Sequence, residues 1–276
     1  MPTTRQYTFD IDTKRYLNRV NTYRSLNGLP NITNGDAVDI DNFIIGLKDL
    51  GLWHNAVAWI MRSKYNVGGG TTVLNFGGTS NNTYDGTMAA GASWGLSGIN
   101  FDPLVATAAV SYNVGITEIV RNDHSLVSII NKHNQDNACI FESRGTAVTS
   151  YYSSFTSNDN TASQLLNAST TRNSVQYNSS NRGGTVPTGF TSIGGTILLT
   201  SQSTYKNGVL IATDSNLNIR NPTGTPTQIK TGNGNIRAGT LTIPFIIIFN
   251  TPLSTAQHNS LYRLAKATIA KDLNIP

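Results

Sequence analysis

The chain has 276 residues, a formal net charge of +5 and a pI near 9.3. Its 20 Lys and Arg residues are scattered without a run, which excludes a basic patch for nucleic acid, and no apolar stretch is long enough to insert into a membrane. The single cysteine, Cys139, excludes an intrachain disulfide and a zinc site built from cysteines, and its strand-like context predicts a buried, inert thiol.

Length and composition favour one large β-domain with a helical N-terminal region. Charged residues make up only 13% of the chain, while Asn, Thr, Ser and Gly are abundant, so amides and hydroxyls hold its surface in water. We expect two regions. Residues 1–52 form an arm followed by two helices, and residues 53–276 form the β-domain with a closing helix.

Two helices are predicted near the N-terminus. Apolar residues recur at helical spacing over residues 12–26 among four basic residues, and Gly28 and Pro30 end this segment. The first helix either packs on its own domain or anchors the protein on a larger assembly, and both interpretations stay open. A second amphipathic helix is expected to begin with Asp36 as its cap and to end at Gly51.

The remainder reads as short strands separated by turn residues. This spacing is typical of an antiparallel β-sandwich. Polar loops are expected over residues 157–162 and 179–184. The strands are predicted over residues 56–65, 71–76, 94–101, 125–132, 138–142, 146–155, 164–166, 174–177 and 196–201.

The C-terminal third carries the strongest local signals. Because a type I′ turn needs positive φ at both central residues, Asn207-Gly208 predicts a hairpin in which Tyr205 lies opposite Leu210. Residues 245–249 form a continuous apolar run, which predicts a strand covered on both faces at the centre of the core.

A closing helix is predicted after this strand. Ser254 and Gln257 have the spacing of a capping box, and Leu253 just before them can pack back onto the first turn. Apolar or small residues then recur at helical spacing, at Leu261, Leu264, Ala265, Thr268, Ile269 and Leu273.

Two stretches carry a resemblance to a known family. The succession STYKNGVLIATD, QIKTGNGN and a buried strand that leads through N-x-x-LS into a final helix resembles the C-terminal half of concanavalin A-like, or laminin-G-like, lectin jelly rolls. DNFIIGLKDLGLW, continued by DGTMAAGASWGLSGINFD, is similar to the leader of phage-encoded proteins with this fold. The resemblance implies a mainly β chain, an antiparallel β-sandwich of the jelly-roll type with N-terminal helices and a C-terminal helix.

The family also hosts glucanases, so a catalytic site was sought. Retaining glycosidases need two carboxyl groups about 5 Å apart, and the glucanase relatives place theirs in an E-x-D-x-E strand that this chain lacks. Its two glutamates are Glu118 and Glu142, and Glu142 reads as an ion-pair partner of Arg144. Residues 91–95 match G-x-S-x-G, but their flanks do not read as the strand and helix of a nucleophile elbow. We therefore expect no enzyme, although a site built from distant aspartates stays open.

No metal centre or cofactor is expected from a motif. The four histidines are spread widely, without an acid at ligand spacing. Other laminin-G-like domains bind calcium through dispersed aspartates at the rim of the sandwich, and Asp159 and Asp214 lie in predicted loops that could do so. The alternative for each is a solvated turn residue.

A glycan-binding surface is suggested by two tyrosines. Tyr151 and Tyr152 are adjacent on a predicted strand, so their side chains face opposite sides of the sheet and one points away from the core. An exposed aromatic ring can stack on a sugar. The alternative is a half-exposed tyrosine without a ligand.

The resemblance implies a non-enzymatic structural protein of a tailed-phage virion, as a capsid decoration, head fibre or tail component that binds host-surface glycans. Its partners would be other virion proteins and further copies of itself. Residues 1–12 are polar and contain no signal peptide, so synthesis in the host cytoplasm is expected before display on the particle. A polysaccharide-degrading depolymerase or glucanase and a free soluble lectin are the alternatives.

Overall fold

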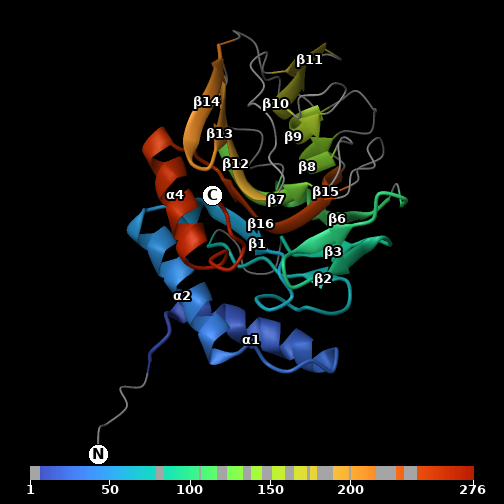
Figure 1. Ribbon diagram of the computed structural model, residues 1–276, viewed down its shortest axis with the longest axis vertical. Coiled ribbons are helices and arrows are strands. Elements are labelled where there is room, and N and C mark those ends of the chain that lie inside the picture. The colour runs from blue at the N-terminus through green and yellow to red at the C-terminus, as the bar shows by residue number, and fades with distance from the viewer. Residues whose placement is uncertain are drawn as a thin grey trace, which may run out of the picture.

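The described part of the chain folds into two antiparallel sheets and three α-helices (Figure 1). This confirms the predicted class, an antiparallel β-sandwich with N-terminal helices and a C-terminal helix. The computed structural model describes residues 7–78, 84–105, 107–116, 123–132, 138–144, 151–158, 165–172, 175–178, 189–198, 200–215, 228–232 and 241–276.

Sheet A has the strand order β14-β13-β12-β7-β16-β5-β4, and β1 also pairs with β16. Its bounds are β1 (Ala56–Ile60), β4 (Ala92–Trp94), β5 (Ile99–Phe101), β7 (His124–Lys132), β12 (Phe190–Ile197), β13 (Gln202–Lys206), β14 (Val209–Asp214) and β16 (Leu241–Phe249).

Sheet B has the order β11-β10-β9-β8-β15-β6-β3-β2. Apolar residues of both sheets, among them Val110, Phe141 and Ile229 of sheet B, share one buried cluster, so the sheets face each other as the layers of a sandwich. The strands of sheet B are β2 (Thr72–Val73), β3 (Gly86–Met88), β6 (Ala109–Tyr112), β8 (Ala138–Arg144), β9 (Tyr151–Asn158), β10 (Leu165–Arg172), β11 (Val175–Asn178) and β15 (Gln228–Gly232).

Strand β16 is buried along its whole length. Ile246 and Ile248 point into the core between the sheets, whereas Phe245, Ile247 and Phe249 point into a second core on the opposite face. Alternate residues of a strand face opposite sides, so a continuous apolar run requires cover on both. The prediction of a central strand buried on two faces is confirmed.

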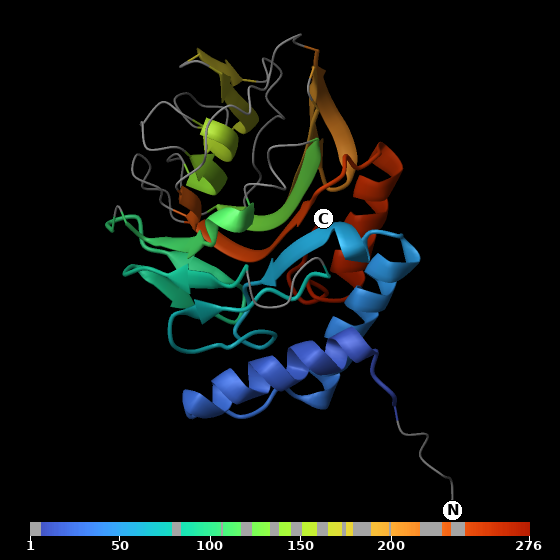
Figure 2. The same ribbon diagram turned by 180° about the vertical axis from the view of Figure 1, so that it is seen from behind.

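The helices α1 (Ile11–Leu26), α2 (Asn34–Asp49) and α4 (Thr255–Ala267) supply the second cover (Figure 2). Their apolar residues, such as Val20, Phe43 and Leu261, belong to the same buried cluster as Phe245 and Phe249. Helix α1 thus packs on its own domain, which is one of the two interpretations that its sequence allowed.

The signals at two helix starts had different outcomes. The capping box of Ser254 and Gln257 is present at the start of α4, as predicted. The cap of α2 is Thr33 and not Asp36, so the helix begins three residues earlier than predicted. The Thr33 hydroxyl accepts from the Asp36 backbone N–H at 3.2 Å and donates to its carboxylate at 2.6 Å, so Asp36 belongs to the first turn.

The predicted Asn207-Gly208 hairpin is confirmed. Tyr205 pairs with Leu210, and the two turn residues have φ of 50° and 74°. A Cβ on Gly208 would lie 2.7 Å from the Cα of Asn259 in α4, so the glycine also permits close packing of the hairpin on that helix.

Three predicted strands have different bounds in the structure. Residues 94–101 form the hairpin β4–β5 because the chain turns back between Trp94 and Ile99, with Gly98 at a φ of 150°. Residues 56–65 are extended only to Ile60, and residues 71–76 are strand only at β2.

Other predicted elements lie partly or wholly in residues that the structure does not describe. Strand β9 ends at Asn158, inside the loop expected over 157–162, whose residues 159–162 fall outside the described ranges. Residues 146–150 of the strand expected over 146–155, and the loop expected over 179–184, fall outside them as well. Strand β10 continues to Arg172, well past the predicted end at residue 166.

The strand predicted over residues 196–201 is instead β12, which runs through Gly194 and Gly195. The predicted strand began only at Thr196, after these two glycines, and glycine usually weakens a strand. Here a Cβ on Gly194 would lie 2.8 Å from Nδ1 of His258, so this glycine makes room for a side chain of α4 to pack on the sheet.

His258 belongs to a buried polar network that joins α4 to sheet A. Its Nε2 lies 2.9 Å from the Thr196 hydroxyl, which in turn lies 2.8 Å from the Ser125 hydroxyl. Thr196 donates to the backbone oxygen of Leu253, and Ser125 accepts from the Leu253 N–H. The ring of Tyr205 stacks on the imidazole at 3.7 Å, and burial lowers the pKa of His258 to about 3.

This burial predicts a loss of stability in mild acid. The unfolded chain protonates His258 below about pH 6.5, whereas the folded chain resists protonation until about pH 3. The contribution of the neutral, buried His258 to the free energy of unfolding is therefore complete above about pH 6.5. It is lost as the pH falls, by about 1.4 kcal/mol for each pH unit. Urea unfolding at pH 7.5 and pH 5.0 should show that the stability difference between wild type and His258→Gln shrinks by about 2 kcal/mol.

The exposed His54 provides the matched control. His54→Gln should keep the pH dependence of the wild type. A difference between wild type and His258→Gln that is equal at both pH values would contradict the prediction.

Candidate functional site

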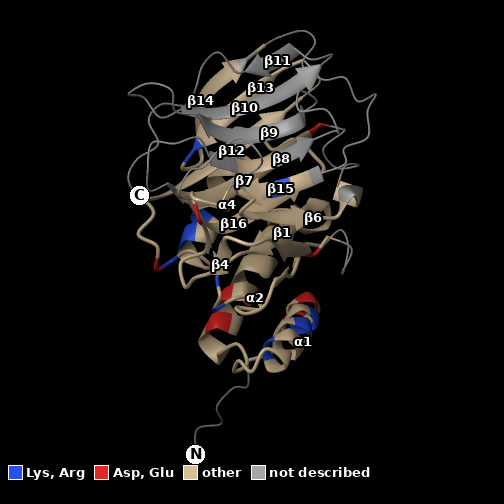
Figure 3. Ribbon diagram, turned by 90° about the vertical axis from the view of Figure 1, so that its right-hand side faces the viewer, with Lys and Arg blue, Asp and Glu red and all other residues tan. Residues whose placement is uncertain are grey.

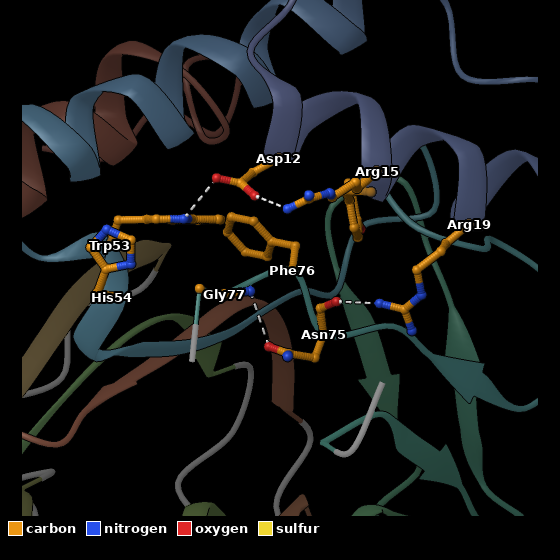
Figure 4. A pocket seen from close by; sticks show the side chains of 10 residues that line it. Asp12, Arg15, Arg19, Trp53, His54, Asn75, Phe76 and Gly77 are labelled. Carbon is orange, nitrogen blue, oxygen red and sulfur yellow. Dashed lines mark hydrogen bonds and ion pairs between the residues drawn. The ribbon is translucent and has the colours of Figure 1, made fainter. Parts of the chain in front are cut away.

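A cleft of about 210 Å³ lies where α1 meets the start of β1 (Figure 4). Asp12, Arg15 and Arg19 of α1 form one wall. The opposite wall consists of the short 3-10 helix at Trp53–Asn55 and the segment 75–78 that follows β2. Figure 3 shows that charged residues gather on α1 and α2, while the described strands of the sandwich carry few. The cleft is therefore built at the most charged part of the fold.

Hydrogen bonds and ion pairs hold the Asp12 side chain in place in one wall of the cleft. Its carboxylate accepts a hydrogen bond from the Trp53 indole N–H at 3.1 Å and pairs with Lys48 at 2.7 Å. It also lies in the first turn of α1, where the helix dipole favours a negative charge. Lys48 reaches Asp10, the cap of this helix, at 2.6 Å, so α1 and α2 are joined by ion pairs beside the cleft.

Arg15 projects further into solvent, with 68% of its side chain exposed. Its guanidinium meets the Asp12 carboxylate at 3.2 Å, one turn away on the same helix. An exposed ion pair of this spacing contributes little to stability, about 0.3–0.5 kcal/mol. The guanidinium can therefore exchange this partner for another at little cost.

Arg19 is fixed by contrast. It donates to the backbone oxygen of Asn75 at 3.1 Å and pairs with Asp85 at 2.7 Å, and only 23% of its side chain is exposed. Burial raises the pKa of Asp85, although the Asn75 N–H and the Arg19 guanidinium oppose that rise. Arg19 thus joins α1 to the sandwich and places a positive charge in the wall of the cleft.

The segment 75–78 is shaped by Asn75 and two glycines. The buried Asn75 amide oxygen accepts from the N–H groups of Ala58 and Gly77 at 3.0 and 3.1 Å. A Cβ on Gly77 would lie 2.5 Å from the Ala56 oxygen, so a larger residue would push the segment away from β1. Gly78 meets Trp53 in the same way. The glycines therefore keep this wall against the strand.

The cleft contains few acidic groups and many hydrogen-bond donors. Among the described residues that line it, Asp12 is the one carboxylate, and its oxygens already accept from an indole and two cations. Glycoside hydrolysis usually requires two carboxyl groups. The guanidinium groups, the exposed His54 and the backbone of 75–78 can instead donate and accept hydrogen bonds.

The residues that the sequence predicted to be functional do not line this cleft, and the side chains of several lie outside the described part of the chain. Tyr151 and Tyr152 lie in β9, a strand as expected, but their side chains are outside the described part of the chain. The same holds for the side chains of Glu142, Arg144 and Cys139 in β8, and Glu118 falls outside the described residues altogether. The glycan and ion-pair predictions for these residues stay predictions.

Asp214 is the last residue of β14 and not a loop residue, so its predicted setting was wrong. The hairpin extends further than the loop residues after it suggested, and Asp214 still pairs with Gln202. Asp159 lies outside the described residues. Within the described ranges, no three His, Cys, Asp or Glu residues gather closely enough to hold a metal ion, and no helix is long and apolar enough to cross a membrane.

Ser93 of the G-x-S-x-G match lies in β4 and pairs with Asn100. The chain continues from it into a turn and then β5, so the strand-to-helix elbow that would activate a serine is not formed.

Sequence reasoning missed the cleft itself. Arg15 and Arg19 were interpreted as two of the basic residues of an amphipathic helix, and Asp12 as the first residue of that helix. Their spacing of three and then four residues places them on one side of α1, which was the available signal. The other wall comes from residues 75–78, and no local pattern links these to the helix.

Comparison with known proteins supports the architecture. No family model and no curated protein sequence matches the chain. A solved structure of Trypanosoma rangeli sialidase in complex with sialic acid matches with a TM-score of 0.59 and 10% identity, over 94% of this chain and 39% of that one. The binding domain of botulinum neurotoxin serotype D matches with a TM-score of 0.57 and 11% identity, over 77% of this chain and 52% of that one.

A botulinum neurotoxin type C structure also matches, with a TM-score of 0.53 and 13% identity, over 78% of this chain and 52% of that one. The chain thus spans about 40 to 50% of the length of these matched chains. At such identities the similarity shows the β-sandwich fold alone. It does not extend to the phage relationship that the sequence resemblance implies.

The two arginines of the cleft should differ in their effect on stability. Arg19→Gln leaves the partly buried Asp85 without its cation, so we expect a loss of about 1–3 kcal/mol at pH 7. The loss should be smaller at pH 4, because the raised pKa of Asp85 lets a neutral carboxyl replace the charge there. Urea unfolding at both pH values measures this.

Arg15→Gln is the matched control from the same helix. Removing its exposed ion pair should change the free energy of unfolding by less than about 0.5 kcal/mol. Equal losses in the two variants would show that Arg19 does not fasten α1 to the sandwich.

Proposed function

We propose that the chain is a non-enzymatic carbohydrate-binding β-sandwich protein whose ligand site is the cleft beside α1. The observation that carries this proposal is the lining of the cleft, in which guanidinium groups, an imidazole and backbone amides surround a polar hollow with a single carboxylate. Such convergent donors and acceptors fix the orientation of a polar ligand.

The structural neighbours add support from their own ligands. One matched sialidase was solved in complex with sialic acid, and the matched neurotoxin type C is described as depending on interaction with two ganglioside molecules for cell entry. The cleft, at about 210 Å³, is smaller than the roughly 300–1,000 Å³ of sites for drug-sized ligands. It therefore suits one sugar unit at the end of a longer glycan.

The absence of catalysis is part of the proposal. Asp12 is bound to Lys48 and to Trp53, so it is poorly placed to exchange protons with a substrate. A depolymerase or glucanase would need a second carboxylate at the same cleft.

The intact protein should bind a subset of glycans on an array without changing them. Isothermal titration with the best glycan should then show at least a fivefold weaker affinity for His54→Ala, because this exposed imidazole lines the cleft. Leu104→Ala, at an exposed position outside the lining, should bind as the wild type does.

The other outcomes separate the alternatives. Loss of affinity in Tyr151→Ala or Tyr152→Ala, with His54→Ala unaffected, would move the site to β9. Release of shortened glycan products would overturn the non-enzymatic assignment, and the absence of any bound glycan would overturn carbohydrate binding.

Within this function we propose that the chain is displayed on the surface of a tailed-phage particle. The resemblance of its leader segment to phage-encoded proteins with a lectin-like fold supports this, and so does an exposed apolar edge. Val209, Leu210 and Ile211 are all exposed on β14, which in the described part of the sheet pairs only with β13. Exposed edges favour pairing with a strand of a neighbouring subunit, which is why most proteins protect them.

Mass spectrometry of particles purified from the source should detect the wild-type chain. Ile211→Lys should reduce its incorporation, because a charge on the edge opposes strand pairing. Leu104→Lys is the control for an added surface charge. Absence of the wild-type chain from purified particles would exclude this location and favour a free lectin.

A further inference from the structure

We infer that Arg15 determines the specificity of the cleft and selects a carboxylated sugar, by exchanging its contact with Asp12 for the carboxylate of the ligand. This inference rests on the proposed carbohydrate-binding function. It assigns the ligand to one chemical class, the acidic sugars, and it assigns the selection to one residue.

Arg15 is free to change partners. Its side chain is 68% exposed and its contact with Asp12 is 3.2 Å long. Water and salt screen an ion pair of this kind, so the pair resists exchange only weakly. Arg15 lies in the second turn of a helix that is itself packed on the sandwich through Tyr16 and Val20. The fold therefore fixes the backbone position of Arg15, while its exposed side chain can exchange hydrogen-bond partners.

Asp12 does not depend on Arg15. Lys48 lies 2.7 Å from its carboxylate and the Trp53 indole donates to it at 3.1 Å. When Arg15 turns away, the carboxylate keeps a cation and a hydrogen-bond donor. The exchange therefore leaves no charge without a partner, which is the usual obstacle to breaking an ion pair.

Arg19 cannot take the same role. Its guanidinium is bound to Asp85 at 2.7 Å and to the Asn75 oxygen at 3.1 Å, and it joins α1 to the sandwich. Its charge in the wall is offset by the Asp85 carboxylate. A ligand carboxylate would therefore meet one guanidinium that can turn toward it and a second that is already paired.

The chemistry of guanidinium favours an acid over a neutral sugar. Its planar donors match the two oxygens of a carboxylate, which can accept two parallel hydrogen bonds. A sugar hydroxyl offers a single neutral acceptor. It would bind the Arg15 guanidinium more weakly than the Asp12 carboxylate does, so the exchange would not be favourable. The preference should therefore depend on the charge of the ligand and weaken as salt is added.

The test compares an oligosaccharide that ends in glucuronic acid with its methyl ester, in which a methyl group replaces the negative charge. Titration of the intact wild-type protein at low salt should show at least tenfold tighter binding of the acid. In Arg15→Gln the two ligands should bind alike, because the acid should lose far more affinity than the ester. Arg15→Lys should keep part of the preference, because it retains the charge without the planar fork.

Arg263→Gln, an exposed arginine on α4 that does not line the cleft, is the control for a lost surface charge and should keep the full preference. Equal binding of acid and ester by the wild type would overturn the inference and leave carbohydrate binding intact. An Arg15→Gln variant that loses both ligands equally would also overturn it, because Arg15 would then shape the site without selecting charge. Binding of neither ligand, nor of any other glycan, would overturn the proposed function itself.

Discussion

The two-sided burial of β16 is the constraint on which the other layers depend. Five consecutive large apolar residues cannot leave one face of a strand in water, since each buried side chain of this size contributes about 1.5–3 kcal/mol. Sheet B covers Ile246 and Ile248, and the three helices cover Phe245, Ile247 and Phe249. The helices are therefore a third layer of the fold, and α1 takes a fixed place in it.

That place is secured by polar contacts as well as apolar ones. The buried Arg24 of α1 donates to the backbone oxygens of Pro30, Ser63 and Asn66, and so ties the helix to the segment after β1. Arg19 makes a second tie near the middle of the helix. Lys48 and Trp53 hold Asp12 at one end of the cleft wall, and Asp85 holds Arg19 at the other. The cleft is therefore preformed, and binding need not supply the entropy cost of ordering it.

Sequence patterns predicted the elements whose causes are local. Asn207-Gly208, the Ser254 capping box and the apolar run 245–249 each act within a few residues, and the structure has all three. Strand β12 was misplaced because the reason for Gly194 lies in His258, more than sixty residues away. The cleft was missed for the same reason, since α1 meets residues 75–78 only through the tertiary fold. Local patterns carry no record of such contacts.

The cleft lies partly outside the β-sandwich, so the fold of the sandwich alone does not indicate what the cleft binds. The sandwich accounts for the similarity to the sialidase and the neurotoxins, at 10 to 13% identity. Four of the cleft residues, however, belong to a helix packed outside the sandwich, and its charges are arranged by ion pairs that the strands do not supply. Sandwiches of this kind host many functions, so ligand choice is decided by what is added to them. In the site that we propose, two arginines four residues apart differ in their bonding: Arg19 holds the helix in place, and Arg15 is left available to a ligand.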